Sequence, residues 1–239
     1  MPTLRPLADG LWCVDHREFS VGGLQIGTRT TVIRLSDGTL VVHSPGPLSP
    51  ANFDEIRAIG LVSHVIAPNR MHNLYYASAC AAFPDASHLA VPGFSPKQPG
   101  ARLDGILTET LPASLAGDLE AIPLLGAAKL NELLLFHPST ATLLAVDVAF
   151  NIRNATGFLH FAMWLNGAND RFCMTRLGKS QYLDDHAASA KSVDRACDAW
   201  PIERVVVAHG EVLETGGRLA LRDAYAFGRV AKSYSASQM

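Results

Sequence analysis

The chain has 239 residues, 48% of them hydrophobic, which is enough to bury the core of one large domain or of two fused halves. Its 20 Lys and Arg residues nearly balance its 22 Asp and Glu residues, and no basic stripe favours nucleic acid as a partner. The four cysteines are far apart and argue against a disulfide framework or a structural zinc site. The N-terminus lacks the apolar region of a secretory signal, and no stretch approaches the ~20 apolar residues of a membrane span. We therefore expect a cytoplasmic protein without a membrane partner.

The first third of the chain has the pattern of antiparallel strands followed by a helix. Residues 10–15 are typical of a short strand, and residues 19–25, which contain two adjacent glycines, are typical of a loop. The segments TTVIRL (30–35) and TLVVH (39–43) flank Ser-Asp-Gly, which is a strong hairpin signal. A proline-rich loop follows, and residues 50–60 are predicted to form a helix that ends at a glycine.

The turn at residues 61–73 organises this half of the chain. Residues 62–67 are apolar and suit a buried strand, which should stop at Pro68 because proline cannot donate to a sheet. Residues 74–83 are rich in alanine and predict a helix packed on that sheet. The connecting residues therefore lie at the C-terminal edge of a strand, where α/β proteins tend to bind ligands and metals. They include Asn69, His72 and Asn73. The alternative is an ordinary connection with a surface histidine.

A short strand at 89–91 and a loop at 94–114 that could cover a pocket are expected next. The second half is then predicted to repeat the order of hairpin, helix and strand. Its expected elements are a strand at 120–125, a hairpin of 132–136 with 141–148, helices within 150–200, a buried strand at 202–208 and a terminal helix at 218–230. The returning strand of the hairpin contains Asp147, and the last strand ends at His209.

The two halves, about residues 10–90 and 120–230, share this order of elements without a residue-level repeat. We predict a single domain over residues 1–239 of mixed α/β (α+β) class. Two mixed sheets would stack face to face with helices outside them, giving a four-layer αββα sandwich.

Polar residues that close apolar strands are the informative ones. Asp147 lies in LLAVDVAF, and an unpaired buried carboxylate costs several kcal/mol, so it requires a metal, a basic side chain or backbone N–H donors. His209 in VVVAHGE offers a neutral imidazole at a strand end. Two imidazoles and one carboxylate form a common ligand set for Zn, Fe or Mn and leave positions open for water. The alternative is that Asp147 caps a loop and His209 bonds a carbonyl.

Other chemistries have less support in the sequence. The chain contains no GxSxG elbow, no P-loop and no GxGxxG after a strand. The aromatic residues of FLHFAMWL (158–165) are expected to pack in the core or at a homodimer interface rather than to stack on a base.

Four segments occur in the order typical of the metallo-β-lactamase superfamily. They are TLVVHSP at 39–45, the loop at His72, the LLAVD strand and the VVVAHG strand. Over essentially its whole length the chain resembles that superfamily, and most closely the uncharacterised DUF4336 branch, which shows IGTRxTVxRLSDG, HSP and a PNxxH loop. The resemblance implies a metallo-β-lactamase-like sandwich and a metal-dependent hydrolase.

The chain departs from the H-x-H-x-D-H motif of this family, where it has the residues APNRMH (67–72). Counting back from the following helix places His72 on the last histidine, Asn69 on the second and Met71 on the aspartate. A gap of one to three residues would shift this register. The later histidine of the family is absent from residues 125–131. The first metal position is therefore predicted to be dismantled.

The remaining residues resemble the second metal position, with His72, Asp147 and His209 as ligands. They would bind one divalent metal, Zn first and Fe or Mn as alternatives, or none if the site is vestigial. The metal would lower the pKa of a bound water towards ~7, and this water would attack a small ester, lactone or thioester. His43, Asn69 and Asn73 could line the pocket and orient water or substrate. The alternative is a catalytically inactive member that serves as a binding or assembly module.

Overall fold

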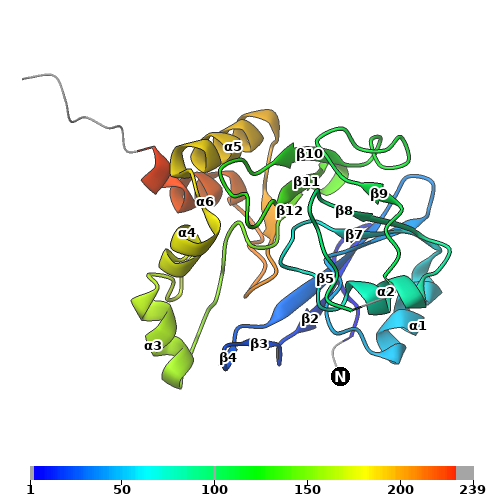
Figure 1. Cartoon of the computed structure of the whole chain (residues 1–239), viewed down its shortest axis with the longest axis horizontal. Helices are drawn as coiled ribbons and strands as arrows, with labels where there is room; N and C mark the ends of the chain where they lie inside the picture. The colour runs from blue at the N-terminus through cyan, green and yellow to red at the C-terminus, as the bar shows by residue number, and fades with distance from the viewer. Residues whose placement is uncertain (1–2, 99–100, 230–239) are drawn as a thin grey trace, which may run out of the picture.

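The computed structural model describes residues 3–98 and 101–229, and within these ranges two sheets lie face to face with helices outside them (Figure 1). The first sheet has the order β1-β2-β5-β6-β7-β8-β9. Its strands are β1 (Arg5–Ala8), β2 (Leu11–His16), β5 (Thr28–Arg34), β6 (Leu40–His43), β7 (Val62–Ala67), β8 (Ser87–Ala90) and β9 (Gly105–Ile106). The pairs from β1 to β6 are antiparallel and those from β6 to β9 are parallel, so the sheet is mixed as predicted.

Two helices pack on the outer face of the first sheet: α1 (Pro50–Ile59) and α2 (Tyr76–Ala82). Helix α1 begins where predicted because the Ser49 hydroxyl accepts from the backbone N–H of Asn52, and the Asn52 side chain accepts from Ser49 in return. Helix α2 is shorter than predicted and has no side-chain cap at its start. The predicted loop at 19–25 contains a small hairpin, β3 (Ser20–Val21) and β4 (Leu24–Gln25).

The second sheet has the order β10-β11-β12-β13. Its strands are β10 (Glu120–Pro123), β11 (Leu133–His137), β12 (Thr142–Leu144) and β13 (Arg204–Val206), and the helices of this half are α3 (Gly157–Leu165), α4 (Arg176–Tyr182), α5 (His186–Ala199) and α6 (Gly217–Ala224). Helices α5 and α6 pack on the outer face of the sheet. The predicted terminal helix extended to Val230, which lies outside the described residues; α6 itself stops at Ala224.

Strand β11 shows how the two sheets share the core. Leu133 and Leu135 pack in the cluster that also contains the first sheet, whereas Leu134 and Phe136 pack in the cluster under α5 and α6. Both faces of the strand are buried, which explains its uninterrupted apolar sequence.

Two strand ends differ from the prediction. Strand β12 stops at Leu144, three residues before Asp147, and β13 stops at Val206, three residues before His209. Beyond β12, the backbone N–H groups of Val146 and Asp147 donate to the Glu132 carboxylate instead of to a neighbouring strand. Asp147 and His209 therefore lie in the loops that leave the sheet edge. Over the described ranges, each helix is too short or too polar to traverse a lipid bilayer.

Candidate metal centre

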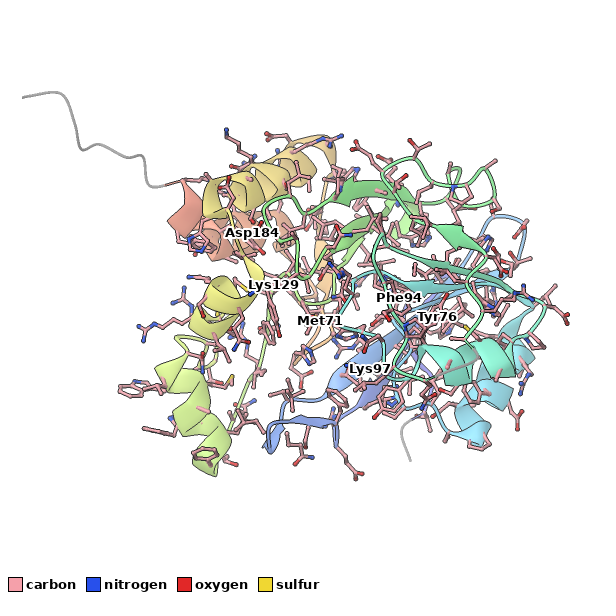
Figure 2. The ribbon with its side chains drawn as sticks, in the orientation of Figure 1. Met71, Tyr76, Phe94, Lys97, Lys129 and Asp184 are labelled. Carbon is pink, nitrogen blue, oxygen red and sulfur yellow. The ribbon has the colours of Figure 1, made fainter. Side chains whose placement is uncertain are left out.

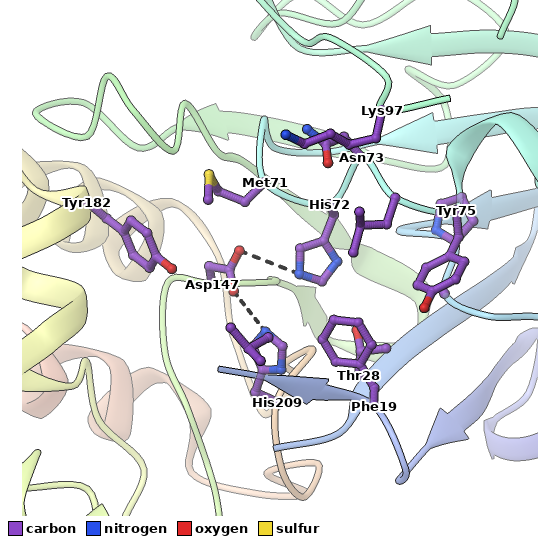
Figure 3. A pocket seen from close by; sticks show the side chains of 14 residues that line it. Phe19, Thr28, Met71, His72, Asn73, Tyr75, Lys97, Asp147, Tyr182 and His209 are labelled. Atoms are coloured by element: carbon purple, nitrogen blue, oxygen red, sulfur yellow. Dashed lines mark ion pairs between the residues drawn. The ribbon is translucent and has the colours of Figure 1, made fainter. Parts of the chain in front are cut away.

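The structure brings together His72, Asp147 and His209, which follow β7, β12 and β13 respectively. Nε2 of His209 lies 3.2 Å from Oδ1 of Asp147, and Nε2 of His72 lies 3.5 Å from Oδ2 (Figure 3). One ligand atom from each residue lies within 4.8 Å of the others. Among the described residues, no other cluster of three or more His, Cys, Asp or Glu side chains has this spacing.

A backbone carbonyl sets the tautomer of the His209 ring. Nδ1 of His209 lies 2.6 Å from the carbonyl oxygen of Gly27, and because a carbonyl can only accept, Nδ1 carries the proton. In the neutral ring, Nε2 then presents a lone pair towards the Asp147 carboxylate. A lone pair that faces a carboxylate suits a shared cation, and a backbone carbonyl on the other nitrogen is typical of histidine metal ligands. The Phe150 ring, stacked on that of His209 at 5.1 Å, holds this orientation.

The His72 ring also has a hydrogen-bond partner on its Nδ1. This nitrogen lies 2.8 Å from the Ser44 hydroxyl, which can accept a hydrogen bond from Nδ1–H and leave Nε2 free on the Asp147 side. The backbone before the ring is held by Asn69, whose side-chain oxygen accepts from the N–H groups of Met71 (3.0 Å) and His72 (2.9 Å).

Two buried side chains, Asn69 and Glu132, hold Asp147 in place through hydrogen bonds. Nδ2 of Asn69 donates to Oδ2 of Asp147 at 2.8 Å and to Oε2 of Glu132 at 3.1 Å. The Glu132 carboxylate also accepts from the backbone of Val146 (2.7 Å) and of Asp147 (2.8 Å). We did not predict this role for Glu132, which the sequence places at the start of an apolar strand. An acid next to four apolar residues was nevertheless the same signal that singled out Asp147.

The electrostatics of the two buried carboxyl groups, Asp147 and Glu132, favour a cation between the imidazoles and Asp147. Burial acts to raise the pKa of Asp147, but His72 and then His209 outweigh it and hold that pKa well below its usual range. Burial, reinforced by the charge of Asp147, raises the pKa of Glu132 to about 7. The Asp147 carboxylate beside two imidazole nitrogens forms a donor set that suits a divalent metal, and Glu132 supports it through Asn69 and the backbone.

Arg29 of β5 ties the His209 loop to the first sheet. Its guanidinium donates to the carbonyl oxygens of Val207 and Gly210, on either side of His209, and to Oδ1 of Asp15 at 2.6 Å. The Gly27 carbonyl that fixes the His209 ring lies two residues earlier in the same segment. This segment of the first half therefore positions a candidate ligand of the second half, a contact that we did not predict.

A cavity of about 340 Å³ opens beside His72, Asp147 and His209. This volume is at the lower end of the range found for small-molecule sites. Its wall is mainly aromatic and aliphatic, and Asn73 and Lys97 contribute polar groups. The residues of the wall besides the ligands include Phe19, Val21, Thr28, Met71, Leu74, Tyr75 and Tyr182 (Figure 3).

Lys97 belongs to a segment that is fixed against α2. Its backbone N–H donates to the carbonyl oxygen of Asn73 at 3.2 Å. Three residues earlier, the Phe94 ring meets the Tyr76 ring edge-on at 4.9 Å (Figure 2). The start of the predicted 94–114 loop thus contributes to the wall of the cavity, while residues 99 and 100 lie outside the described residues.

The structure divides the three residues expected to line the pocket. Asn73 lines the cavity, whereas Asn69 is fully buried and acts through Asp147 and His72. His43 lies apart from the cavity wall, at the end of β6 and among residues of both sheets that include Thr31 and Val206. Both of its ring nitrogens are buried without a hydrogen-bond partner among the described residues.

Comparisons with known proteins identify the fold. The sequence matches no protein-family model and no curated protein. Among solved structures, a metallo-β-lactamase from Pontibacter korlensis gives a TM-score of 0.66 at 11% identity, covering 95% of this chain and 99% of that one. The metallo-β-lactamase FIM-1 from Pseudomonas aeruginosa, in a mono-zinc form, gives 0.67 at 7% identity, covering 96% and 97%. One from Erythrobacter litoralis gives 0.62 at 13% identity, covering 94% and 92%. The chain therefore has the metallo-β-lactamase fold, as predicted.

Proposed function

We propose that this protein is a metal-dependent hydrolase that binds one divalent metal through His72, Asp147 and His209. The observation that carries the proposal is the orientation of both imidazoles, each with a partner on Nδ1 and with Nε2 aimed at the Asp147 carboxylate. The fold is consistent with it, since one of the similar metallo-β-lactamases was solved in a mono-zinc form. Zinc is our first candidate, and iron and manganese are alternatives.

The proposed site is a reduced version of the family's two-metal arrangement, as in the DUF4336 branch that the sequence resembles. The support is that Asn69 offers an amide where the family has an imidazole, and Met71 offers a thioether where the family has a carboxylate. The Asn69 amide is already occupied by hydrogen bonds to Asp147 and to the backbone. Residues 125–131 contain no histidine.

A divalent ion at this position would act as a Lewis acid and lower the pKa of water towards ~7. The residues of the chain would balance the charge of this ion, orient its ligands and bind the substrate. Asp147 balances the charge, while Gly27 and Ser44 keep the two imidazoles in the required orientation. The largely apolar cavity would hold the acyl part of a small ester, lactone or thioester. Among the described residues of the wall, Lys97 is the one basic side chain of Lys or Arg type, so it would meet an anionic group of the substrate.

Metal analysis tests the proposal directly. Protein purified without a His-tag and incubated with Zn, Mn or Fe is expected to retain about one equivalent of metal. Asp147→Ala should abolish this binding while circular dichroism shows a folded protein. The exposed acid of Asp54→Asn serves as the matched control and should keep the metal. If wild-type protein retains no metal after all three incubations, the metal site is refuted.

A panel of aryl esters, lactones and thioesters tests the reaction. Hydrolysis by the metal-loaded protein should disappear in His209→Ala, because Nε2 of His209 faces the proposed metal position. Activity that survives this substitution would contradict the mechanism.

A second candidate, an inactive binding or assembly module, is favoured by the structural use of Asn69 at the altered motif. One bound metal without hydrolysis of any substrate in the panel would select this candidate.

A further inference from the structure

Helix α3 presents an aromatic face to the outside of the molecule. Phe158 is 72% exposed, Phe161 52% and Trp164 62%, whereas Ala162 and Met163 on the opposite side are buried. The exposed rings follow one another along the helix, with centroids 6.5 Å and 6.1 Å apart. Of the two places expected for these aromatic residues, the core or a homodimer interface, the core was therefore wrong, because the helix packs with its small and flexible residues and turns its large rings outward.

The aromatic face is defined as Phe158, Phe161, Trp164 and Leu165. Its exposed apolar area is large for the surface of a monomeric protein. At ~200 Å² per aromatic side chain, its three rings alone expose roughly 350–400 Å², a size that usually marks an interaction site. The β3–β4 hairpin packs beside the helix and adds the exposed Val21, which also lines the cavity. In Figure 1, α3 and this hairpin lie at one end of the molecule, away from most of both sheets.

Basic residues without an ion pair among the described residues flank the aromatic face along the chain. Residues 150–183 contain four basic residues and one acid, although the whole chain is acidic with a net charge of −2. The basic residues are Arg153, Arg171, Arg176 and Lys179, of which Lys179 places its Nζ over the Phe227 ring, 4.1 Å from the centroid. None of the four forms an ion pair within the described part of the chain, whereas eight arginines elsewhere in it do. Arg176 lies at the C-terminal end of α3, where it donates to the carbonyl oxygen of Leu165 at 3.0 Å.

We propose that the aromatic face of α3 binds the surface of an anionic phospholipid bilayer. Aromatic and leucine side chains enter the boundary between headgroups and acyl chains, and neighbouring arginines meet lipid phosphates. The nine residues of α3 are too few to cross a bilayer, so the helix lies along its surface. The expectation of no membrane partner rested on the lack of a spanning segment, and a surface contact needs none.

The charge around the helix argues against a second copy of the chain as the occupant. In a twofold contact the same patch meets itself. Such a contact would bring the cations at 153, 171 and 176 of both copies to one interface, with a single acid, Asp170, in each segment to offset them. Anionic headgroups provide the complementary charge that a second copy lacks. The inference does not depend on the proposed metal site.

Trp164 provides a spectroscopic probe for the experiment. It is well exposed, whereas Trp200 is buried. With metal-free protein, vesicles of equal parts phosphatidylglycerol and phosphatidylcholine are expected to co-sediment the protein and to shift its tryptophan emission to shorter wavelength. Vesicles of pure phosphatidylcholine, or added salt, should weaken the binding about tenfold. Trp164→Phe should lose the spectral shift and keep the co-sedimentation.

Two variants and a control locate the contact. The double variant Phe158→Ser/Phe161→Ser is expected to bind anionic vesicles at least ~10-fold more weakly, and Arg171→Gln several-fold more weakly. Leu61→Ser, which removes an exposed apolar side chain remote from α3 in the sequence, should bind like the wild type. All variants are compared by thermal melting to confirm folding.

Two results would overturn the proposal. The first is the absence of co-sedimentation with the anionic vesicles, or equal loss of binding in Leu61→Ser and the double variant. The second is a stable dimer in sedimentation velocity that the double variant abolishes, since a second copy would then cover the aromatic face. Both measurements use metal-free protein, so neither result bears on the proposed hydrolase.

Discussion

The Asn69 side chain uses both of its polar atoms beside Asp147. Its oxygen accepts two backbone N–H groups of the His72 loop, and its nitrogen donates to Asp147 and Glu132. We expect Asn69→Ala to lower the free energy of unfolding by about 2–4 kcal/mol, because it leaves several buried groups unpaired. Urea denaturation of the metal-free protein measures this loss, and zinc titration should show weaker binding.

Asn69→Asp separates the roles of shape and charge at this position. The aspartate has nearly the same size, but it places a third carboxyl group against Asp147 and Glu132, so its loss of stability should exceed that of the alanine variant. Asn73→Ala, which removes a single hydrogen bond to Arg70, serves as the control and should cost less than ~1 kcal/mol. Equal stability of Asn69→Asp and the wild type would contradict the proposed network.

His43 makes the stability of the protein sensitive to acid. Burial, and then the nearby His72, lower the pKa of its ring to about 3 in the folded protein. In the unfolded chain a histidine has a pKa of ~6.5, so below this pH the unfolded state takes up a proton that the folded state refuses. The contribution of His43 to stability is therefore lost progressively as the pH falls from about 6.5 towards 3.

His43→Leu should remove this sensitivity. At pH 4.5 the variant is expected to be more stable than the wild type by roughly 2–3 kcal/mol. At pH 7.5 it should be at least as stable, because the ring makes no hydrogen bond among the described residues that leucine would lose. Urea denaturation at both pH values, with a chelator present, gives the comparison. Parallel losses of stability in acid for the two proteins would show that His43 is not the cause.

At the scale of secondary-structure elements, the turn after β13 depends on Gly210. Its φ of +96° is one that side chains rarely adopt, and a Cβ there would lie 2.2 Å from the carbonyl oxygen of Asn151. We expect Gly210→Ala to destabilise the protein by about 3 kcal/mol or more and to displace His209. Gly216→Ala is the matched control, since Gly216 has a φ of +70° with open space around its Cβ position. This control should cost only ~1 kcal/mol.

Both glycine variants can be followed by thermal melting and by metal content. If the glycine at 210 serves only the turn, Gly210→Ala lowers the melting temperature and leaves metal binding intact in the folded fraction. We expect both to fall, because the Asn151 backbone that the new Cβ strikes also accepts from Glu211 and donates to His209.

Elements defined by local signals were predictable from the sequence. The hairpin of β5 and β6 follows its Asp-Gly turn, and α1 follows its capping serine and proline. Strand ends were less predictable where a distant side chain captures the backbone, as Glu132 does at Val146. Hydrophobic periodicity also left the orientation of α3 undetermined, because that helix is apolar on both faces and the sequence does not specify which face meets the protein.

The clustering of the three candidate ligands was predictable for a different reason. His72, Asp147 and His209 are polar residues that follow apolar strands, and the edge where such strands end is a single place in a stacked-sheet fold. The groups that hold these ligands were not predictable from spacing. Arg29 and Gly27 act on the His209 loop across about 180 positions of the chain, and no local pattern encodes such a contact.

At the scale of the whole molecule, Arg29 is a buried polar bridge between the two halves. Only 5% of its side chain is exposed, and its three contacts join Asp15 in the first half to Val207 and Gly210 in the second. Although burial acts to raise the pKa of Asp15, Arg29 and Arg5 together hold it below its usual value. A buried cation with three satisfied acceptors is costly to remove, because the acceptors remain behind.

Arg29→Met keeps the length of the side chain and removes these contacts. We expect the free energy of unfolding to fall by about 3–5 kcal/mol and the zinc dissociation constant to rise ~10–100-fold, because the His209 loop loses its anchor. Arg5→Met is the control, since Arg5 pairs with the same carboxylate but is 44% exposed, and it should cost less than ~1 kcal/mol and leave zinc binding unchanged. Urea denaturation and competition with a zinc chelator measure the two effects. If both variants behave alike, the ion pair with Asp15 is what matters, and the contacts to the second half do not hold the candidate site together.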